Sequence, residues 1–127
     1  MRDFKTLAVW QKAHQFVLAL CEATKAFPKE EQYGLTSQIR RAAIFISANI
    51  AEGCGKNTDA DFARYIHISI GSANEVDYYL LLARDLLIMD APKSTQLSSQ
   101  VTEVRRMLIG LTQALRTPRS PLTAPRS

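Results

Sequence analysis

The chain is 127 residues long, 46% hydrophobic and 22% charged, which is typical of one globular domain. Its amino end lacks the features of a secretory leader, and no uninterrupted apolar run reaches the roughly 18 residues that a membrane span needs. Two cysteines are too few for a disulfide framework. We therefore expect a soluble cytoplasmic protein that does not enter a membrane.

The formal net charge of +4 is a weak indication of nucleic-acid binding. Arg116, Arg119 and Arg126 lie at the carboxyl end of the chain, and without them 13 basic residues face 12 acidic ones. The body of the protein is therefore close to neutral. Any contact with nucleic acid must come from local clusters of basic side chains.

The first predicted helix runs from about Leu7 to Ala26. Pro28 ends it, and a short charged connector leads to Leu35. Apolar residues recur along this helix at intervals of three and four, as expected for a single buried face. They include Val9, Ala13, Phe16 and Leu20.

The second predicted helix runs from about Leu35 to Glu52. Two of its faces are expected to pack against other helices, and the third, which includes Thr36 and Arg40, is expected to face solvent. Gly53 is expected to cap it in the left-handed conformation. At about 100° per residue, one face is apolar. It consists of Leu35, Ile39, Ala42, Ala43, Ile46 and Ile50. A second stripe along its border consists of Gln38, Arg41, Phe45, Asn49 and Glu52.

The third predicted helix runs from about Thr58 to Met89, and Thr58 and Asp61 form an acidic capping box at its start. It carries two adjacent rows of residues, which indicates that it contacts neighbours on two sides. The core-facing row is Phe62, Ile66, Ser69, Ala73, Val76, Leu80, Ala83 and Leu87. The second row is Tyr65, Ile68, Ser72, Glu75, Tyr79, Leu82 and Leu86.

Pro92 is expected to end the third helix, and a fourth runs from about Ser94 to Leu115 with a single apolar row. Residues 117–127 are rich in Pro and Ser and are predicted to be a disordered tail. Short connections between successive helices predict an all-α, antiparallel up-down-up-down four-helix bundle over residues 1–116.

The two central helices present more apolar circumference than the other helices of one chain can cover, which predicts a homo-oligomer. Polar residues among them then fix helix register or subunit orientation. The alternative is a shallow polar binding site. The residues assigned to this interface are Gln38, Arg41, Phe45, Asn49, Glu52, Tyr65, Ser72, Glu75, Tyr79 and Leu82.

A set of basic residues forms the candidate nucleic-acid contact. If they converge in an oligomer, symmetry multiplies weak phosphate contacts. The alternative is that they are ordinary solvated charges balanced by nearby carboxylates. Aromatic platforms for single strands are not evident, because Phe and Tyr mostly follow the core periodicity. The basic candidates are Arg40, Lys56, Arg64, Arg105 and Arg106.

Nothing in the sequence predicts catalysis. There is no Gly-rich phosphate loop, no nucleophile elbow and no carboxylate cluster. His14 and His67 lie on different predicted helices, with no further His or Cys at ligand spacing. We therefore expect a protein without enzymatic activity, bound metal or cofactor.

Several short motifs within residues 4–90 resemble a known bacterial family of four-helix bundles. The family was first noticed as open reading frames in intervening sequences of large-subunit ribosomal RNA genes, and the accessory variability determinant of diversity-generating retroelements belongs to the same superfamily. The motifs are Leu7-x-Val9-Trp10-Gln11-Lys12-Ala13, Pro28-x-Glu30-x-x-Tyr33-Gly34-Leu35, Gln38-x-x-Arg41-Ala42-Ala43, Asn49-Ile50-Ala51-Glu52-Gly53 and Gly71-Ser72-x-x-Glu75.

This resemblance implies a four-helix protomer and a ring-shaped homopentamer. In the retroelement branch the pentamer is basic and assists a reverse transcriptase, contacting both the enzyme and nucleic acid; in the other branch the molecular role is not established. This chain departs from the family pattern at two positions. Ile70 stands where members often have Arg, and Phe45 where they often have Ser. Both changes make the expected interface more apolar and argue against strong nucleic-acid binding.

Two functions of different classes follow from the sequence. The first is a non-catalytic homo-oligomeric scaffold that acts through protein–protein interaction. The alternative is an RNA- or DNA-binding accessory protein, for example to a reverse transcriptase or to ribosomal RNA.

Overall fold

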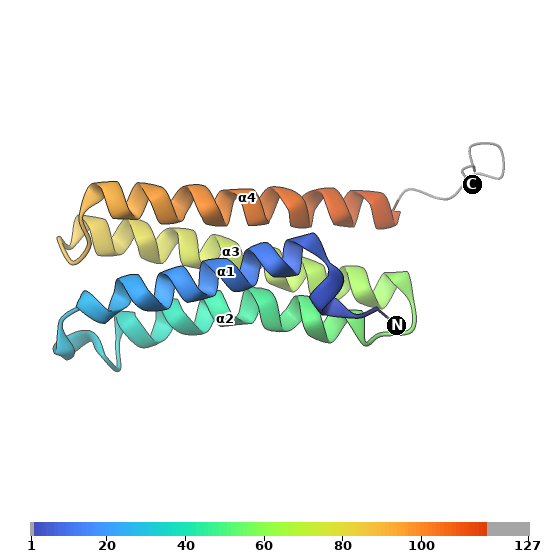
Figure 1. The fold of residues 1–127 in the computed structure, drawn as a ribbon, viewed down its shortest axis with the longest axis horizontal. Coiled ribbons are helices and arrows are strands. Elements are labelled where there is room, and N and C mark those ends of the chain that lie inside the picture. Colours follow the sequence, from blue (N-terminus) through green and yellow to red (C-terminus); the bar gives the residue numbers. More distant parts are fainter. Residues whose placement is uncertain (1, 117–127) are drawn as a thin grey trace.

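The computed structural model describes residues 2–116, which form four α-helices packed side by side (Figure 1). Successive helices run in opposite directions, each packs against the next, and α1 also packs against α4. This arrangement confirms the predicted all-α four-helix bundle. The predicted disordered tail, residues 117–127, lies outside the described residues. The helices are α1 (Ala8–Ala23), α2 (Leu35–Cys54), α3 (Asp59–Asp85) and α4 (Ala91–Arg116).

Short 3-10 helices accompany the first half of the bundle. The predicted first helix is divided, because its last three residues form a separate 3-10 turn after α1 ends at Ala23. The connector to α2 contains another turn, so the chain reverses without a long loop. The 3-10 helices are Phe4–Thr6, Thr24–Ala26 and Lys29–Glu31.

The core is built from the apolar faces that the sequence predicts. Every residue of the apolar face of α2 is buried, as is the core-facing row of α3 up to Ala83. The buried polar member of that row, Ser69, is satisfied because its Oγ donates a hydrogen bond to the carbonyl oxygen of Ile46 at 2.9 Å. The other two helices contribute Val9, Ala13, Phe16, Leu20, Leu97, Val101, Val104 and Leu108.

The predicted end of the third helix is wrong by one turn. α3 ends at Asp85, and Leu87 has a φ of 61° and is 90% exposed instead of lying in the core. The amides of Ile88 and Met89 both donate to the carbonyl of Ala83, so the chain turns back sharply. The turn buries Met89, which covers the end of the core in place of Leu87.

The start of the fourth helix also lies earlier than predicted. α4 begins at Ala91, and the Oδ1 atom of Asp90 accepts a hydrogen bond from the amide of Lys93 at 2.7 Å. Asp90 therefore caps α4, and Pro92 lies in its first turn, where a missing amide hydrogen costs little. Pro92 thus lies at the start of α4 and does not end the preceding helix.

Gly53 has a different role from the predicted left-handed cap. It lies inside α2, is buried, and has no positive φ. A Cβ atom at this position would come within 2.9 Å of the Cβ atom of Tyr65 and 3.0 Å of Cδ1 of Phe62. Glycine is therefore needed here because α2 and α3 approach each other closely.

Candidate interaction surfaces

The stripe of α2 and the second row of α3 lie on the same outer side of the bundle. α2 and α3 pack against each other with Tyr65 beside Gly53 and Ser69 bonded to Ile46. At about 100° per residue, both sets flank this contact on the side away from α1 and α4. We call this surface the α2/α3 face. Its residues are Gln38, Arg41, Phe45, Asn49, Glu52, Tyr65, Ile68, Ser72, Glu75, Tyr79, Leu82 and Leu86.

The α2/α3 face leaves large apolar side chains in contact with solvent. Phe45, Ile68 and Leu86 are 42%, 43% and 54% exposed. Beside them other members are only partly covered by the chain itself, so the exposed groups join a wider apolar area. The half-buried members are Tyr65, Tyr79 and Leu82.

Polar groups on this face bond within their own helices. The Nδ2 atom of Asn49 donates to the carbonyl of Phe45 at 2.8 Å, and the hydroxyl of Tyr79 donates to Oε2 of Glu75 at 2.9 Å, a bond that raises the pKa of Tyr79. The guanidinium of Arg41 lies 5.1 Å from the centre of the Phe45 ring. These contacts do not join α2 to α3, so within one chain they do not fix the register of the two helices.

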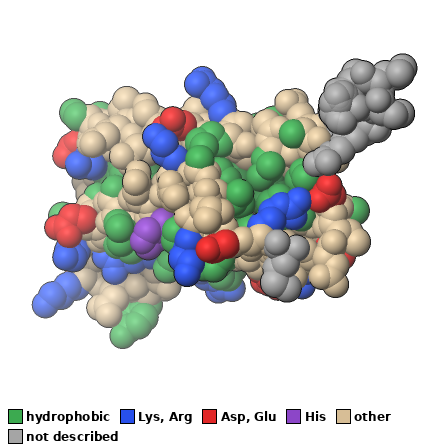
Figure 2. Space-filling view, turned by 45° about the vertical axis from the view of Figure 1, so that its right-hand side comes forward, with side chains coloured by type: hydrophobic (Ala, Val, Ile, Leu, Met, Phe, Trp, Pro, Cys, Tyr) green, Lys and Arg blue, Asp and Glu red, His purple; other side chains and the backbone are tan. Residues whose placement is uncertain are grey.

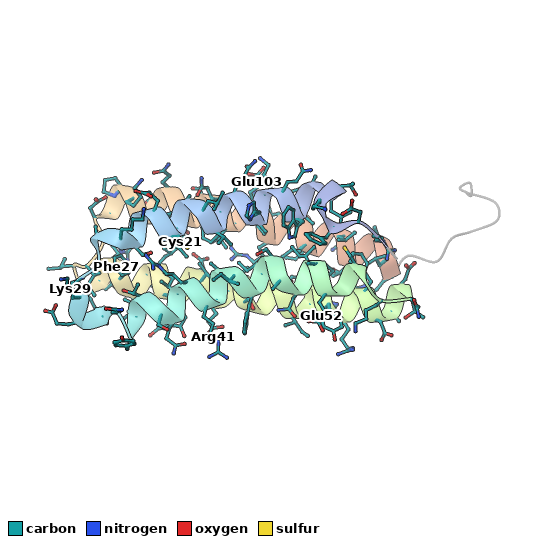
Figure 3. All side chains as sticks on the ribbon, turned by 60° about the horizontal axis from the view of Figure 1, so that its bottom comes forward. Cys21, Phe27, Lys29, Arg41, Glu52 and Glu103 are labelled. Carbon is teal, nitrogen blue, oxygen red and sulfur yellow. The ribbon has the colours of Figure 1, made fainter. Side chains whose placement is uncertain are left out.

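The remaining predicted interface residues divide by exposure. Ser72 is buried, whereas Gln38 and Glu52 are exposed. Arg41 and Glu52 both point away from the bundle along the outer edge of α2 (Figure 3). These two charged groups are therefore available to a partner on the α2/α3 face.

The structure places Arg40 and Thr36 differently from the prediction that they face open water. Arg40 is half-buried, and its guanidinium donates to the hydroxyl of Thr24 at 2.8 Å and to the carbonyl of Cys21 at 3.1 Å. Thr36 is only 8% exposed. Helical periodicity places both residues on the solvent side of α2, but it does not show that Cys21 and Thr24 lie against Arg40 in the folded chain.

The start of α2 also borders a shallow, open depression of about 510 Å³ on the surface. Its lining combines basic, hydroxyl and apolar side chains, and we call it the α2 pocket. Sequence reasoning missed it, since Tyr33 lies in the connector and only folding brings it beside the helix. The lining residues are Gln32, Tyr33, Thr36, Ser37, Arg40, Arg41, Ile44 and Phe45.

Arg105 and Arg106 lie together on α4, where they line an open groove of about 830 Å³ between α3 and α4. Arg105 is half-buried and donates to Oδ2 of Asp77 and to the hydroxyl of Thr102, both at 3.2 Å. Its charge is thus balanced within the chain. Arg106 is exposed at the edge of the groove.

Lys56 and Arg64 flank a single aromatic ring at the start of α3. The Nζ atom of Lys56 lies 5.0 Å from the centre of the Tyr65 ring, and the guanidinium of Arg64 lies 4.7 Å from it. Arg64 also lies 4.0 Å from a carboxylate oxygen of Asp61. The basic candidates therefore occupy three separate places in one chain and form no single patch. Figure 2 likewise shows basic and acidic side chains interspersed on the face in view.

The histidine and cysteine residues do not converge on a metal site within residues 2–116. No group of three or more His, Cys, Asp or Glu side chains there could hold a metal ion. His14 stacks on Trp10 at a ring separation of 5.0 Å. Cys21 and Cys54 are free thiols, and burial raises the pKa of Cys54.

None of the helices within residues 2–116 has the length and apolar character that crossing a bilayer requires.

Comparison with known proteins decides the family. A family model described as the 23S rRNA-intervening sequence protein matches residues 5–110. The chain belongs to this family. The match extends beyond the motif-bearing first three helices and covers most of α4, for which the sequence motifs offered only a periodic pattern. The resemblance that the motifs indicated is thereby confirmed.

A solved structure with a similar sequence shares the fold. It is a protein with unknown function from the S23 ribosomal protein family of Bacteroides thetaiotaomicron, 27% identical, with a TM-score of 0.76. The similarity covers 87% of this chain and 100% of that one. No curated protein matches the chain. The family and this relative establish the architecture but assign no molecular function.

Proposed function

We propose that this member of the 23S rRNA-intervening sequence family is a non-catalytic homo-oligomeric scaffold that acts through protein–protein contacts. One observation supports the proposal most directly. The α2/α3 face exposes Phe45, Ile68 and Leu86 beside half-buried aromatic and aliphatic side chains. Several large apolar side chains exposed on one side of a small domain are typical of a surface that another protein covers.

We propose five subunits in a closed ring, the number that the family resemblance implies. A ring requires two different surfaces on each subunit, since the contact is head-to-tail. The α3/α4 side of the bundle is the second candidate surface, because Tyr78 and Leu81 are 57% and 44% exposed there. The free thiols Cys21 and Cys54 suit the reducing cytoplasm, which is the location we propose.

The oligomer is tested by light scattering on the purified full chain. We expect a mass close to five times the 14.2 kDa of one chain. Ile68→Glu and Leu86→Glu should each reduce the mass toward that of the monomer, because a charge on the α2/α3 face must be desolvated when subunits dock. Helicity should not change, since both side chains are exposed in the single chain.

Leu18→Glu is the matched control. Leu18 is 58% exposed on the outer side of α1, away from the α2/α3 face, so the substitution introduces the same charge without affecting the proposed contact. We expect this variant to retain the mass of the unmodified protein. A monomeric mass for the unmodified protein at micromolar concentration would contradict the proposal.

Nucleic-acid binding is the second candidate function, and Lys56 and Arg64 favour it because both present a cation beside the ring of Tyr65. In an oligomer this combination recurs once per subunit, so weak contacts add together. We expect binding to mixed RNA and DNA oligonucleotides to weaken steeply as salt rises, and to weaken further in the Lys56→Gln, Arg64→Gln double variant. An absence of binding at low salt removes this function.

A further inference from the structure

The residues before α1 cross one end of the bundle. Residues 2–7, which we call the strap, run from the start of α1 to the end of α2 (Figure 1). They include the short helix Phe4–Thr6, which packs against α1 and α2 but contains no fully buried residue. Asp3 accepts hydrogen bonds from the amide of Lys5 and the hydroxyl of Thr6, so the strap holds its own shape. Segments with few buried apolar side chains open more easily than core helices.

Arg2 joins the strap to the other side of this crossing through three contacts. Its backbone amide donates to the carbonyl oxygen of Cys54 at 2.8 Å, and its Nη2 atom donates to Oδ1 of Asp59 at 2.7 Å. The guanidinium carbon lies 4.2 Å from the centre of the Phe62 ring. Arg2 therefore ties the strap both to the end of α2 and to the first turn of α3.

The thiol of Cys54 lies close to the strap. Cys54 is only 1% exposed, and burial raises its pKa. The charge of Arg2 lowers the same pKa and that of Asp3 raises it, so both strap residues lie near the sulfur. A reagent in solution cannot reach this sulfur unless part of the structure opens. Of the segments beside it, the strap is the one that lies outside the four long helices.

We propose that the strap opens as a unit while the four helices stay folded, and that Arg2 is the latch that holds it closed over Cys54. The ion pair of the latch is partly open to water, since the side chains of Arg2 and Asp59 are 34% and 61% exposed. Such ion pairs contribute little to stability and weaken as salt rises. The latch can therefore release without disturbing the apolar core. Its contacts lie within one chain, so the proposal does not depend on self-association.

Thiol labelling under native conditions tests whether the strap opens separately. The chain has two cysteines, so Cys21→Ser leaves Cys54 as the only thiol. Dithiobis(nitrobenzoate) releases one nitrothiobenzoate ion for each thiolate that attacks its disulfide, and absorbance follows the release. We expect a labelling rate that does not change at low urea and rises steeply only where circular dichroism shows the helices unfolding. A rate with the urea dependence of global unfolding throughout, or a rate equal to that of free cysteine, overturns the proposal.

Two substitutions in the Cys21→Ser background test the latch. Asp59→Asn removes the ion pair and should speed labelling about two- to fivefold. Arg2→Ala also removes the contact with the ring of Phe62 and should speed it about tenfold. Added salt should speed labelling of the Cys21→Ser protein, measured relative to free cysteine, but not of its Asp59→Asn variant. Helicity should not change in either variant, because the strap lies outside the long helices.

Asp61→Asn in the same background is the matched control. Asp61 is also an exposed residue in the first turn of α3, but its carboxylate lies near Arg64 and not near the strap. The substitution therefore removes the same charge from the same turn without affecting the latch. We expect its labelling rate to equal that of the Cys21→Ser protein. If Asp59→Asn and Arg2→Ala label no faster than Asp61→Asn, Arg2 is not the latch and the proposal is wrong.

Discussion

Replacing Ile46 with aspartate is expected to abolish the folded bundle. Ile46 is 0% exposed at the centre of the apolar face of α2, and its carbonyl accepts the hydrogen bond from Ser69. A carboxylate there must either lose its hydration or take up a proton, at a cost of several kcal/mol. Total stabilities of domains are only about 5–15 kcal/mol. Circular dichroism should show a large loss of helicity and of cooperative melting.

Leu80→Asp tests the same argument on the neighbouring helix α3, where Leu80 is 1% exposed and belongs to the core-facing row. Ala48→Asp is the matched control for Ile46→Asp, since Ala48 lies two residues further along α2 and is exposed. We expect the control to retain near-normal helicity and melting. If Ile46→Asp and Leu80→Asp melt like the control, the assignment of these two faces to the core is wrong.

Gly53→Ala is expected to destabilise the protein although alanine is the better helix former. The new Cβ atom would lie 2.9 Å from the Cβ atom of Tyr65 and 3.0 Å from Cδ1 of Phe62, so α2 and α3 must move apart. Overpacking of this kind typically costs about 1–3 kcal/mol. Chemical denaturation monitored by circular dichroism should show a lower unfolding midpoint with an unchanged slope.

The same substitution at Gly110 should have the opposite sign. Gly110 lies inside α4, is exposed, and a Cβ atom there would meet nothing within 4 Å. Alanine then removes only the entropic penalty of glycine in a helix, a gain of about 0.5–1 kcal/mol. Equal effects at Gly53 and Gly110 would show that helix propensity, and not the close approach of α2 and α3, governs both positions.

Much of the candidate site could be predicted from periodicity. The stripe of α2 and the second row of α3 were each visible in the sequence, because side chains three or four residues apart share one side of a helix. The sequence alone does not show that they flank the same contact, because this depends on how α2 and α3 pair. Asn49 and Glu75 remain predicted interface residues; within one chain each takes part in a hydrogen bond on its own helix.

The connectors were the least predictable part. Periodicity predicts that the third helix continues past Asp85, because Leu86 and Leu87 continue the two apolar rows. In the structure the backbone reverses at Leu87, and Met89 is buried in its place. The α2 pocket could not be predicted from helical periodicity for a related reason. It depends on where the connector places Tyr33 and on how α1 covers Arg40, and neither follows a helical repeat.

The amino-acid sequence by itself determined the helical class, the helices and their apolar faces, and the family to which the chain belongs. Those properties depend on contacts a few residues apart, so local spacing records them. Only the tertiary structure decided that Gly53 serves close packing, that Arg105 is balanced by Asp77, and that Arg40 and Thr36 border a pocket. These depend on residues distant in the chain, whose meeting is set by packing geometry and not by the period of any one helix.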